Sequence, residues 1–229
     1  MRRKSFLSRE RPGSWRNLRE TGRTRWWSSL PDFPFITPGL PDSCFRRQAI
    51  PLTRQEVRVV ALAKLRLAPG QVFWDVGTGT GAVAVEAARL IRPEGKVYAV
   101  ERDPERVAVA RANASSWELD NLAILEGEAP EALLSLPSPH RVFVGGSGGK
   151  LGAILKVVGE RLLPGGRVAI TGVTLDTLWE AYRWTDALGW EAELLGMMLV
   201  RGEKVGSRCL LKGGNPIFLV VAEKPGEGR

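Results

Sequence analysis

The sequence predicts an α/β fold built on a mostly parallel β-sheet with helices on both faces. Three observations indicate this fold class. From residue 71 onward short apolar segments alternate with helical ones, a glycine-rich loop follows the first apolar segment at 77–81, and two strand-like segments at 190–200 and 215–223 end the pattern. Apolar strands that alternate with helices are typical of parallel sheets covered on both faces.

The first elements precede the alternating region. Residues 31–52 contain five prolines, which forbid a continuous helix there. Thr53 is expected to cap the first helix, because Glu56 follows three residues later and completes a capping box. That helix is expected to end at Pro69-Gly70.

The alternating region then predicts five strands and five helices. Strands are expected at 72–76, 96–101, 122–126, 141–145 and 166–171. Helices are expected at 80–91, 104–117, 129–135, 149–162 and 174–188. The final strands at 190–200 and 215–223, joined by a loop rich in Gly, Lys and Arg, fit an antiparallel hairpin.

Five β/α units followed by a β-hairpin resemble the class I S-adenosylmethionine-dependent methyltransferase fold. This fold is Rossmann-like, with a mostly parallel seven-stranded sheet and a terminal antiparallel hairpin. A dehydrogenase domain would instead continue with another β/α unit.

Composition excludes several functional classes. Hydrophobic residues make up 44% and charged residues 25% of the 229 residues, which is ordinary for a soluble globular protein. No apolar run approaches the ~18 residues of a membrane helix, so a cytoplasmic protein is expected. Cys44, Cys209 and His140 are the only residues of their types, so neither a metal site nor a histidine-based triad is expected.

The net charge of +8 is concentrated at one end of the chain. Residues 1–30 contain nine Lys/Arg and two Asp/Glu, whereas residues 31–229 contain 24 basic and 23 acidic side chains. The sequence therefore predicts a disordered basic extension at 1–30 and a single domain at 31–229. A basic arm that binds RNA or an acidic partner, and a transit peptide, are the alternatives for the extension.

The glycine-rich loop predicts a nucleotide pocket. Gly77, Gly79 and Gly81 allow a tight turn and a close approach of a ligand to the backbone, and the helix that follows offers unpaired N–H groups. Ala82 also completes a G-x-G-x-x-A pattern, so the spacing alone does not exclude NAD. Asp75 before the turn, the terminal hairpin and the lack of a separate substrate domain favour S-adenosylmethionine. The Asp75 carboxylate either fixes the loop or holds the ligand's ammonium group.

Two further positions complete the expected cofactor site. Glu101 ends the next strand and is expected to accept hydrogen bonds from the two ribose hydroxyls. The alternative is an exposed carboxylate that stabilises a helix N-terminus. The backbone of Glu128-Ala129, after the third strand, is expected to border the adenine ring.

A glycine run at 145–149 follows the fourth strand, beside the expected ligand crevice. It offers backbone N–H groups to an anion, or space for a flat ligand. The basic residues of 201–212, among them Arg201 and Arg208, form either a solvated loop or an anion clamp over the site. The aromatic residues Trp179, Tyr182, Trp184 and Trp190 are expected to pack around the helix at 174–188.

Several segments together resemble one enzyme family. They are Pro38-Gly39-Leu40-Pro41-Asp42, Pro51-Leu52-Thr53, the loop Asp75 to Gly81, Glu101-Arg102-Asp103, Glu126 to Leu133, the run Gly145 to Leu151, Arg201-Gly202 and Asn215-Pro216. From about Pro38 to Glu223 the chain resembles the decarboxylating cobalt-precorrin-6B (carbon-15) methyltransferases of cobalamin biosynthesis, which also form the C-terminal half of precorrin-6Y methyltransferases.

The resemblance implies methylation of a ring carbon of a tetrapyrrole with loss of carbon dioxide from the ring C acetate. It implies S-adenosylmethionine as cofactor, a homotetramer, and a separate protein for methylation of carbon 5. The cofactor residues expected from the loop and the resemblance together are Thr53, Asp75, Gly77, Thr78, Gly79, Thr80, Gly81, Glu101, Glu128 and Ala129. The expected substrate residues are Gly146, Ser147, Gly148, Gly149, Arg201 and Arg208. No residue is predicted as the proton donor.

The alternative function is a tRNA or rRNA methyltransferase of the same fold, with residues 1–30 as an RNA-binding arm. The nearly neutral charge of residues 31–229 argues against it.

Overall fold

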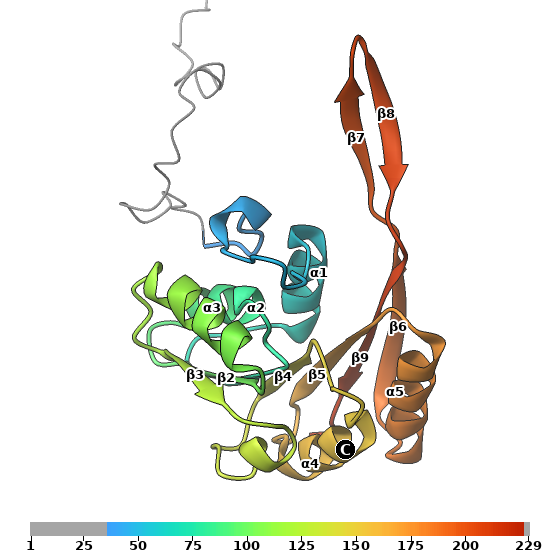
Figure 1. Cartoon of the computed structure of the whole chain (residues 1–229). Helices are drawn as coiled ribbons and strands as arrows, with labels where there is room; N and C mark the ends of the chain where they lie inside the picture. Colours follow the sequence, from blue (N-terminus) through green and yellow to red (C-terminus); the bar gives the residue numbers. More distant parts are fainter. Residues whose placement is uncertain (1–35, 227–229) are drawn as a thin grey trace, which may run out of the picture. The chain divides into compact units, whose positions relative to one another are not determined.

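A seven-stranded sheet with the strand order β3-β2-β1-β4-β5-β9-β6 forms the centre of the fold in this computed structural model, which describes residues 36–226 (Figure 1). Its strands are β1 (Val72–Val76), β2 (Lys96–Glu101), β3 (Leu122–Glu126), β4 (Arg141–Val144), β5 (Arg167–Gly172), β6 (Glu191–Met197) and β9 (Ile217–Glu223). Strands β1 to β5 pair in parallel, and β9 runs antiparallel to both β5 and β6. The predicted fold class is confirmed, and the predicted extension at 1–30 lies outside the described residues.

Helices cover both faces of the sheet. They are α1 (Gln55–Leu65), α2 (Ala82–Leu90), α3 (Pro104–Ser115), α4 (Leu151–Arg161) and α5 (Leu175–Ala187), with short 3-10 turns η2 (Asp42–Cys44) and η3 (Glu131–Leu133). Successive strand residues point to opposite faces. Phe73 accordingly packs with α1 and α2, and Trp74 packs with α4 and α5.

The strand order places a crevice at the carboxyl ends of β1 and β4. From β1 the chain proceeds outward through β2 to β3, and then returns to β4 on the other side of β1. The loops after β1 and β4 therefore lead to opposite faces of the sheet. Ligands of open α/β sheets bind at such a reversal of strand order.

The start of α1 differs from the prediction. Arg54, not Thr53, occupies the N-cap position, and no side chain of the cap residue bonds the helix. The carboxylate of Asp42 accepts a hydrogen bond from the Gln55 N–H at 2.8 Å instead. A distant residue thus replaces the predicted capping box.

Two other predictions are corrected. The expected helix at 129–135 is only the turn η3, because Pro130 and Pro137 leave too little chain for a regular helix before β4. The expected loop at 201–212 is a two-stranded ribbon made by β7 (Val200–Val205) and β8 (Arg208–Gly213), which extends away from the seven-stranded sheet (Figure 1). Gly206, with φ of 60°, forms the tight turn between Val205 and Arg208.

The aromatic residues near α5 divide into two groups. Trp184 and Trp190 pack edge to face with ring centroids 4.9 Å apart, as expected. Trp179 and Tyr182 stack on each other, but both are exposed at the surface of α5, so these two contribute less packing around the helix than expected.

Within residues 36–226, no helix has both the length and the apolar character needed to cross a bilayer.

Candidate functional site

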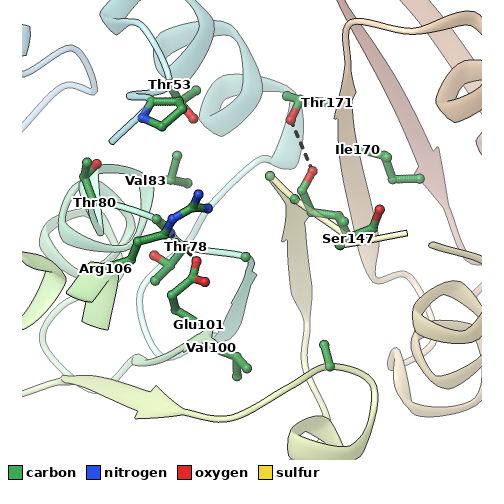
Figure 2. A pocket seen from close by; sticks show the side chains of 18 of the residues that line it. Thr53, Thr78, Thr80, Val83, Val100, Glu101, Arg106, Ser147, Ile170 and Thr171 are labelled. Atoms are coloured by element: carbon green, nitrogen blue, oxygen red, sulfur yellow. Dashed lines mark hydrogen bonds between the residues drawn. The ribbon is translucent and has the colours of Figure 1, made fainter. Parts of the chain in front are cut away.

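A cavity of about 470 Å³ lies at the carboxyl ends of β1, β2, β4 and β5 (Figure 2). Residues 50–54, from the segment that precedes α1, complete its wall. We call this segment, residues 36–54, the lead-in segment. The predicted site residues that line the cavity are Thr53, Gly77, Thr78, Gly79, Thr80, Glu101, Glu128, Ala129, Gly146, Ser147 and Gly148. Asp75, Gly81, Gly149, Arg201 and Arg208 do not line it.

The glycine loop after β1 has a backbone path that excludes side chains. Gly77, Gly79 and Gly81 all have positive φ values. A Cβ atom on Gly77 would lie 2.3 Å from the carbonyl oxygen of Gly146, at the end of β4. The loops after β1 and β4 therefore touch through backbone alone, and the cavity floor stays open to a ligand.

The start of α2 adds hydrogen-bond donors to this floor. Gly81 is its N-cap residue and provides no side-chain cap, so the first N–H groups of the helix lack that partner. Ala82 and Val83, the first residues of α2, line the cavity. This arrangement suits a ligand with polar or negatively charged groups.

Glu101 is held in place by backbone N–H groups at the end of β2. One carboxylate oxygen accepts from the N–H of Gly79 at 3.0 Å, and the other accepts from Arg102 and Asp103 at 3.0 and 3.1 Å. The side chain is nearly buried but borders the cavity (Figure 2). Each carboxylate oxygen can accept more than one hydrogen bond, so room remains for hydroxyl donors. The ribose role of Glu101 stays a prediction.

Asp75 lies beneath the loop and not in the cavity. Its carboxylate accepts a hydrogen bond from the Thr78 hydroxyl at 2.5 Å. This geometry favours the alternative that Asp75 fixes the loop. Burial raises the pKa of Asp75 to about 7, against the lowering effect of the Thr78 hydrogen bond.

The other predicted residues lie in two groups. Glu128, after β3, forms ion pairs with Arg102 at 3.0 Å and with Lys150 at 2.9 Å. Arg201 instead lies on the ribbon and pairs with Glu56 of α1 at 2.7 Å, and Arg208 begins the second strand of the ribbon. The structure therefore does not bring Arg201 or Arg208 to the cavity, and their substrate role stays a prediction.

Sequence reasoning missed three cavity residues with cationic side chains: Arg54, Arg102 and Arg106. Arg102 and Arg106 could have been expected, because they follow Glu101 at the strand end where a ligand binds. Figure 2 shows Arg106 and Glu101 on one side of the cavity and Ser147, Ile170 and Thr171 on the other.

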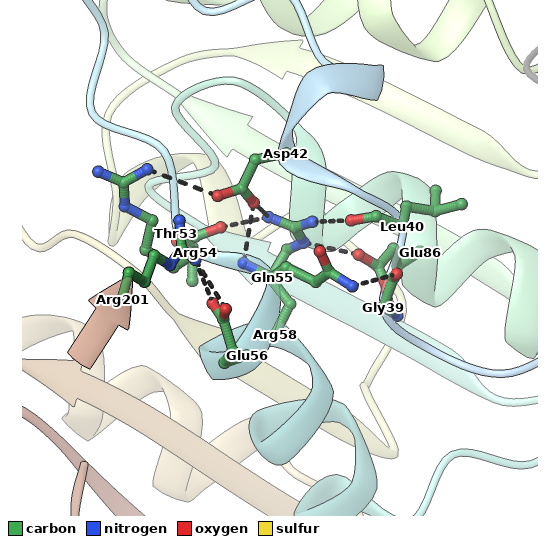
Figure 3. A network of polar contacts seen from close by, with 10 residues as sticks. All are labelled: Gly39, Leu40, Asp42, Thr53, Arg54, Gln55, Glu56, Arg58, Glu86 and Arg201. Carbon is green, nitrogen blue, oxygen red and sulfur yellow. Dashed lines mark hydrogen bonds and ion pairs between the residues drawn. The ribbon is translucent and has the colours of Figure 1, made fainter. Parts of the chain in front are cut away.

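A buried ion network holds the lead-in segment against the domain (Figure 3). Arg58 of α1 is 0% exposed, and its Nε atom lies 2.6 Å from the Glu86 carboxylate of α2. Its Nη1 atom lies 2.9 Å from the Asp42 carboxylate. Arg58 also donates to the backbone carbonyls of Leu40 and Thr53.

Glu86 has a second role in this network. Its other carboxylate oxygen accepts a hydrogen bond from the Gly39 N–H at 2.5 Å. One buried carboxylate thus joins α1, α2 and the start of the lead-in segment. The network was not predicted, because its charged members lie far apart in the sequence.

We expect Glu86→Gln to destabilise the protein by about 3 kcal/mol, since it leaves the buried Arg58 without its closest anion. Chemical denaturation would measure the change. The matched control is Glu193→Gln, which breaks an exposed ion pair with Lys64 at 2.7 Å and should cost below about 1 kcal/mol. Equal losses in the two variants would contradict a dominant role of the buried pair.

Asp75→Asn should change how stability depends on pH. The pKa of Asp75 is raised from 3.8 to about 7 by folding, so the folded state binds the proton more tightly than the unfolded state. This group therefore lowers the wild-type stability as pH rises from about 4 to about 7, by about 1.4 kcal/mol per pH unit at most. The Asn variant lacks this loss, so it should gain stability relative to the wild type across that range.

Denaturation midpoints at several pH values would measure this difference. Asp176→Asn, at an exposed position in the first turn of α5, is the matched control. Parallel pH profiles for Asp75→Asn and the wild type would show that Asp75 ionises normally.

Residues 43–224 match the model of the precorrin methyltransferase domain. The probable cobalt-precorrin-6B C(15)-methyltransferase (decarboxylating) of Sulfolobus acidocaldarius is 40% identical over 189 residues, which cover 82% of this chain and 98% of the relative. The corresponding protein of Pyrobaculum calidifontis is 41% identical over 192 residues, with 83% and 98% covered.

A solved structure supports the same relationship. The precorrin-6y C5,15-methyltransferase from Geobacter metallireducens is 35% identical, with a TM-score of 0.78 over 82% of this chain and 99% of that one. The family match extends over the glycine loop, Glu101 and the glycine run after β4, all of which lie within residues 43–224. The chain therefore belongs to the precorrin methyltransferase family.

Proposed function

We propose that this protein transfers a methyl group from S-adenosylmethionine to carbon 15 of cobalt-precorrin-6B and removes carbon dioxide from the ring C acetate. This reaction is a step of cobalamin biosynthesis. The observation that carries the proposal is that the family match spans the whole cavity, from the lead-in segment to β9.

The residues of the cavity fit the cofactor. The backbone of the loop from Gly77 to Thr80 lines the cavity, and Glu101 presents a fixed acceptor beside it. Thr53 and Ala129 border the same space. Within this set Glu101 would hold the ribose, the glycine loop would contact the amino-acid part, and the backbone at Glu128-Ala129 would border the adenine.

The chain contributes mainly alignment and exclusion of water. When bound, S-adenosylmethionine supplies an electrophilic methyl group. The chain would align the flat substrate along the glycine residues of 145–148 and Ile170, which line one side of the cavity. Correct alignment of two reactants lowers the barrier without a strong protein base.

The contacts of the two carboxylates that line the cavity support a mechanism in which the chain contributes alignment and not a strong base. Glu101 is engaged by three backbone N–H groups, and Glu128 is engaged by Arg102 and Lys150. Both carboxylates are therefore held by other groups of the chain. The electron-rich macrocycle supplies the nucleophilic carbon.

Glu101→Ala should weaken the binding of S-adenosylhomocysteine about 10- to 100-fold, because a charged acceptor of hydrogen bonds is lost. Isothermal titration calorimetry of the two proteins would measure the effect, with thermal unfolding as a check on folding. Methyl transfer and carbon dioxide release are then assayed with cobalt-precorrin-6B. A wild-type protein that binds S-adenosylhomocysteine but transfers no methyl group to this substrate would contradict the proposed function.

The assembly we propose is a homotetramer in the cytoplasm, and methylation of carbon 5 belongs to a separate protein. The exposed ribbon of β7 and β8 supports self-association. It carries apolar side chains at Val200, Val205, Leu210 and Leu211, of which Leu211 is 76% exposed. An isolated two-stranded ribbon is marginally stable in water, and exposed apolar groups of this kind mark interfaces.

Leu211→Glu should therefore reduce the molar mass in solution, since a charge replaces an apolar side chain in the proposed interface. Light scattering of the wild type and the variant would measure it. Leu175→Glu, at an exposed apolar position of α5, is the control and should keep the wild-type mass. A monomeric wild type would exclude the tetramer.

The alternative function, methylation of RNA, depends on the basic residues at 1–30, which lie outside the described residues.

A further inference from the structure

Three charged side chains bridge the cavity rim from three different loops. Glu128, after β3, lies between Arg102, after β2, and Lys150, at the start of α4. We call this group the rim bridge. The distances from the Glu128 carboxylate are 3.0 Å to Arg102 Nη1 and 2.9 Å to Lys150 Nζ. One carboxylate is thus bound by two cations at once.

The rim bridge lies at the boundary between the expected cofactor and substrate regions. Arg102 and Glu128 line the cavity, and Lys150 directly follows the glycine run at 145–149. A Cβ atom on Gly148 would lie 2.8 Å from Arg102 Nη1, so the guanidinium rests against the glycine run. A side chain at Gly148 would displace Arg102, which gives this glycine a second role beside space for a ligand.

The bridge is exposed enough to open. The side chains of Arg102, Glu128 and Lys150 are 56%, 43% and 40% exposed. Ion pairs at such exposures contribute little, because water solvates the separated charges well. The cations lower the pKa of Glu128, with the Lys150 hydrogen bond as the largest cause and the Arg102 hydrogen bond next. Glu128 therefore stays ionised at neutral pH.

We propose that Arg102 and Lys150 are specificity-determining residues that bind a peripheral carboxylate of the tetrapyrrole substrate, and that Glu128 occupies their carboxylate position until the substrate displaces it. This inference rests on the proposed function, which supplies a flat ligand with many carboxylates. It assigns the substrate clamp to the cavity rim and not to Arg201 and Arg208 on the ribbon.

The geometry of the two cations supports this assignment. Arginine and lysine bind carboxylates through charge-assisted hydrogen bonds, and the position of Glu128 shows that both reach one carboxylate together. Arg106 also lines the cavity, but it pairs with Asp103 at 3.4 Å, so Arg102 and Lys150 are the cations that the rim bridge presents to a carboxylate. Glu131, whose carboxylate lies 3.9 Å from Lys150 Nζ, remains near the lysine but away from Arg102.

The test uses uroporphyrin, a stable tetrapyrrole with carboxylates around its whole rim, and measures binding to the full-length protein by quenching of the porphyrin fluorescence. Lys150→Gln and Arg102→Gln should each weaken binding about fivefold. Glu128→Gln should strengthen binding by a similar factor, because it removes the internal competitor. This opposite sign distinguishes the proposal from a purely structural bridge, in which all three variants weaken binding.

Two control variants show whether a cation elsewhere on the domain binds the porphyrin. Lys96→Gln removes an exposed cation at the opposite end of β2 and should leave uroporphyrin binding unchanged. Arg208→Gln tests the rival clamp on the ribbon, and a loss there with none in Lys150→Gln would overturn the proposal. S-adenosylhomocysteine binding is measured alongside. If Arg102→Gln weakened that binding and left uroporphyrin binding intact, Arg102 would belong to the cofactor site.

Failure of this proposal is distinguishable from failure of the proposed function. A wild-type protein that binds no uroporphyrin, or a Glu128→Gln variant that binds it less tightly, would overturn the rim-bridge proposal. Turnover of cobalt-precorrin-6B by the same wild-type protein would still support the proposed function.

Discussion

The site depends on one buried cation, the guanidinium of Arg58. A buried charge without partners is very costly, so the chain must bring acceptors to it. The carboxylates of Asp42 and Glu86 and the carbonyls of Leu40 and Thr53 meet that demand. Two of these four partners are backbone groups of the lead-in segment. Arg58 therefore fixes a proline-rich segment whose one regular element is the short turn η2, and this segment closes one wall of the cavity.

A second constraint acts at the floor of the cavity, where β1 and β4 end side by side. Their loops approach so closely that Gly77 has no room for a Cβ atom next to Gly146. The two glycine-rich loops are therefore parts of one contact. The loop after β1, braced by Asp75 and Glu101, lines the part of the cavity proposed for the cofactor, and the loop after β4 lines the part proposed for the substrate.

Local patterns predicted the elements whose stability is local, and missed those that depend on distant partners. The five parallel strands were placed within one residue at each end, because strand and helix periods alternate clearly. The helix cap at Thr53 was wrong, since Asp42 supplies the acceptor from outside the helix. The ribbon at 200–213 was predicted as a loop because its glycines and charges have loop-like composition. Most of the predicted cofactor residues line the cavity, because the glycine loop that contains many of them has a strong local pattern. Arg102 and Arg106 were not predicted as site residues. The charged residues of the Arg58 network lie too far apart in the sequence to form a recognisable pattern.

Ion pairs serve two purposes in this domain, and the burial of each pair decides which purpose it serves. The Arg58–Glu86 pair has side chains 0% and 1% exposed, so separating its charges would leave both without solvent. The pairs of Glu128 at the rim are about half exposed, so their charges separate at little cost and can exchange partners. A cavity that must hold a cofactor in place and also admit a large anionic substrate needs both properties. The lead-in segment is accordingly fixed by a buried ion network, and the rim beside the glycine run is closed by ion pairs that another carboxylate can replace.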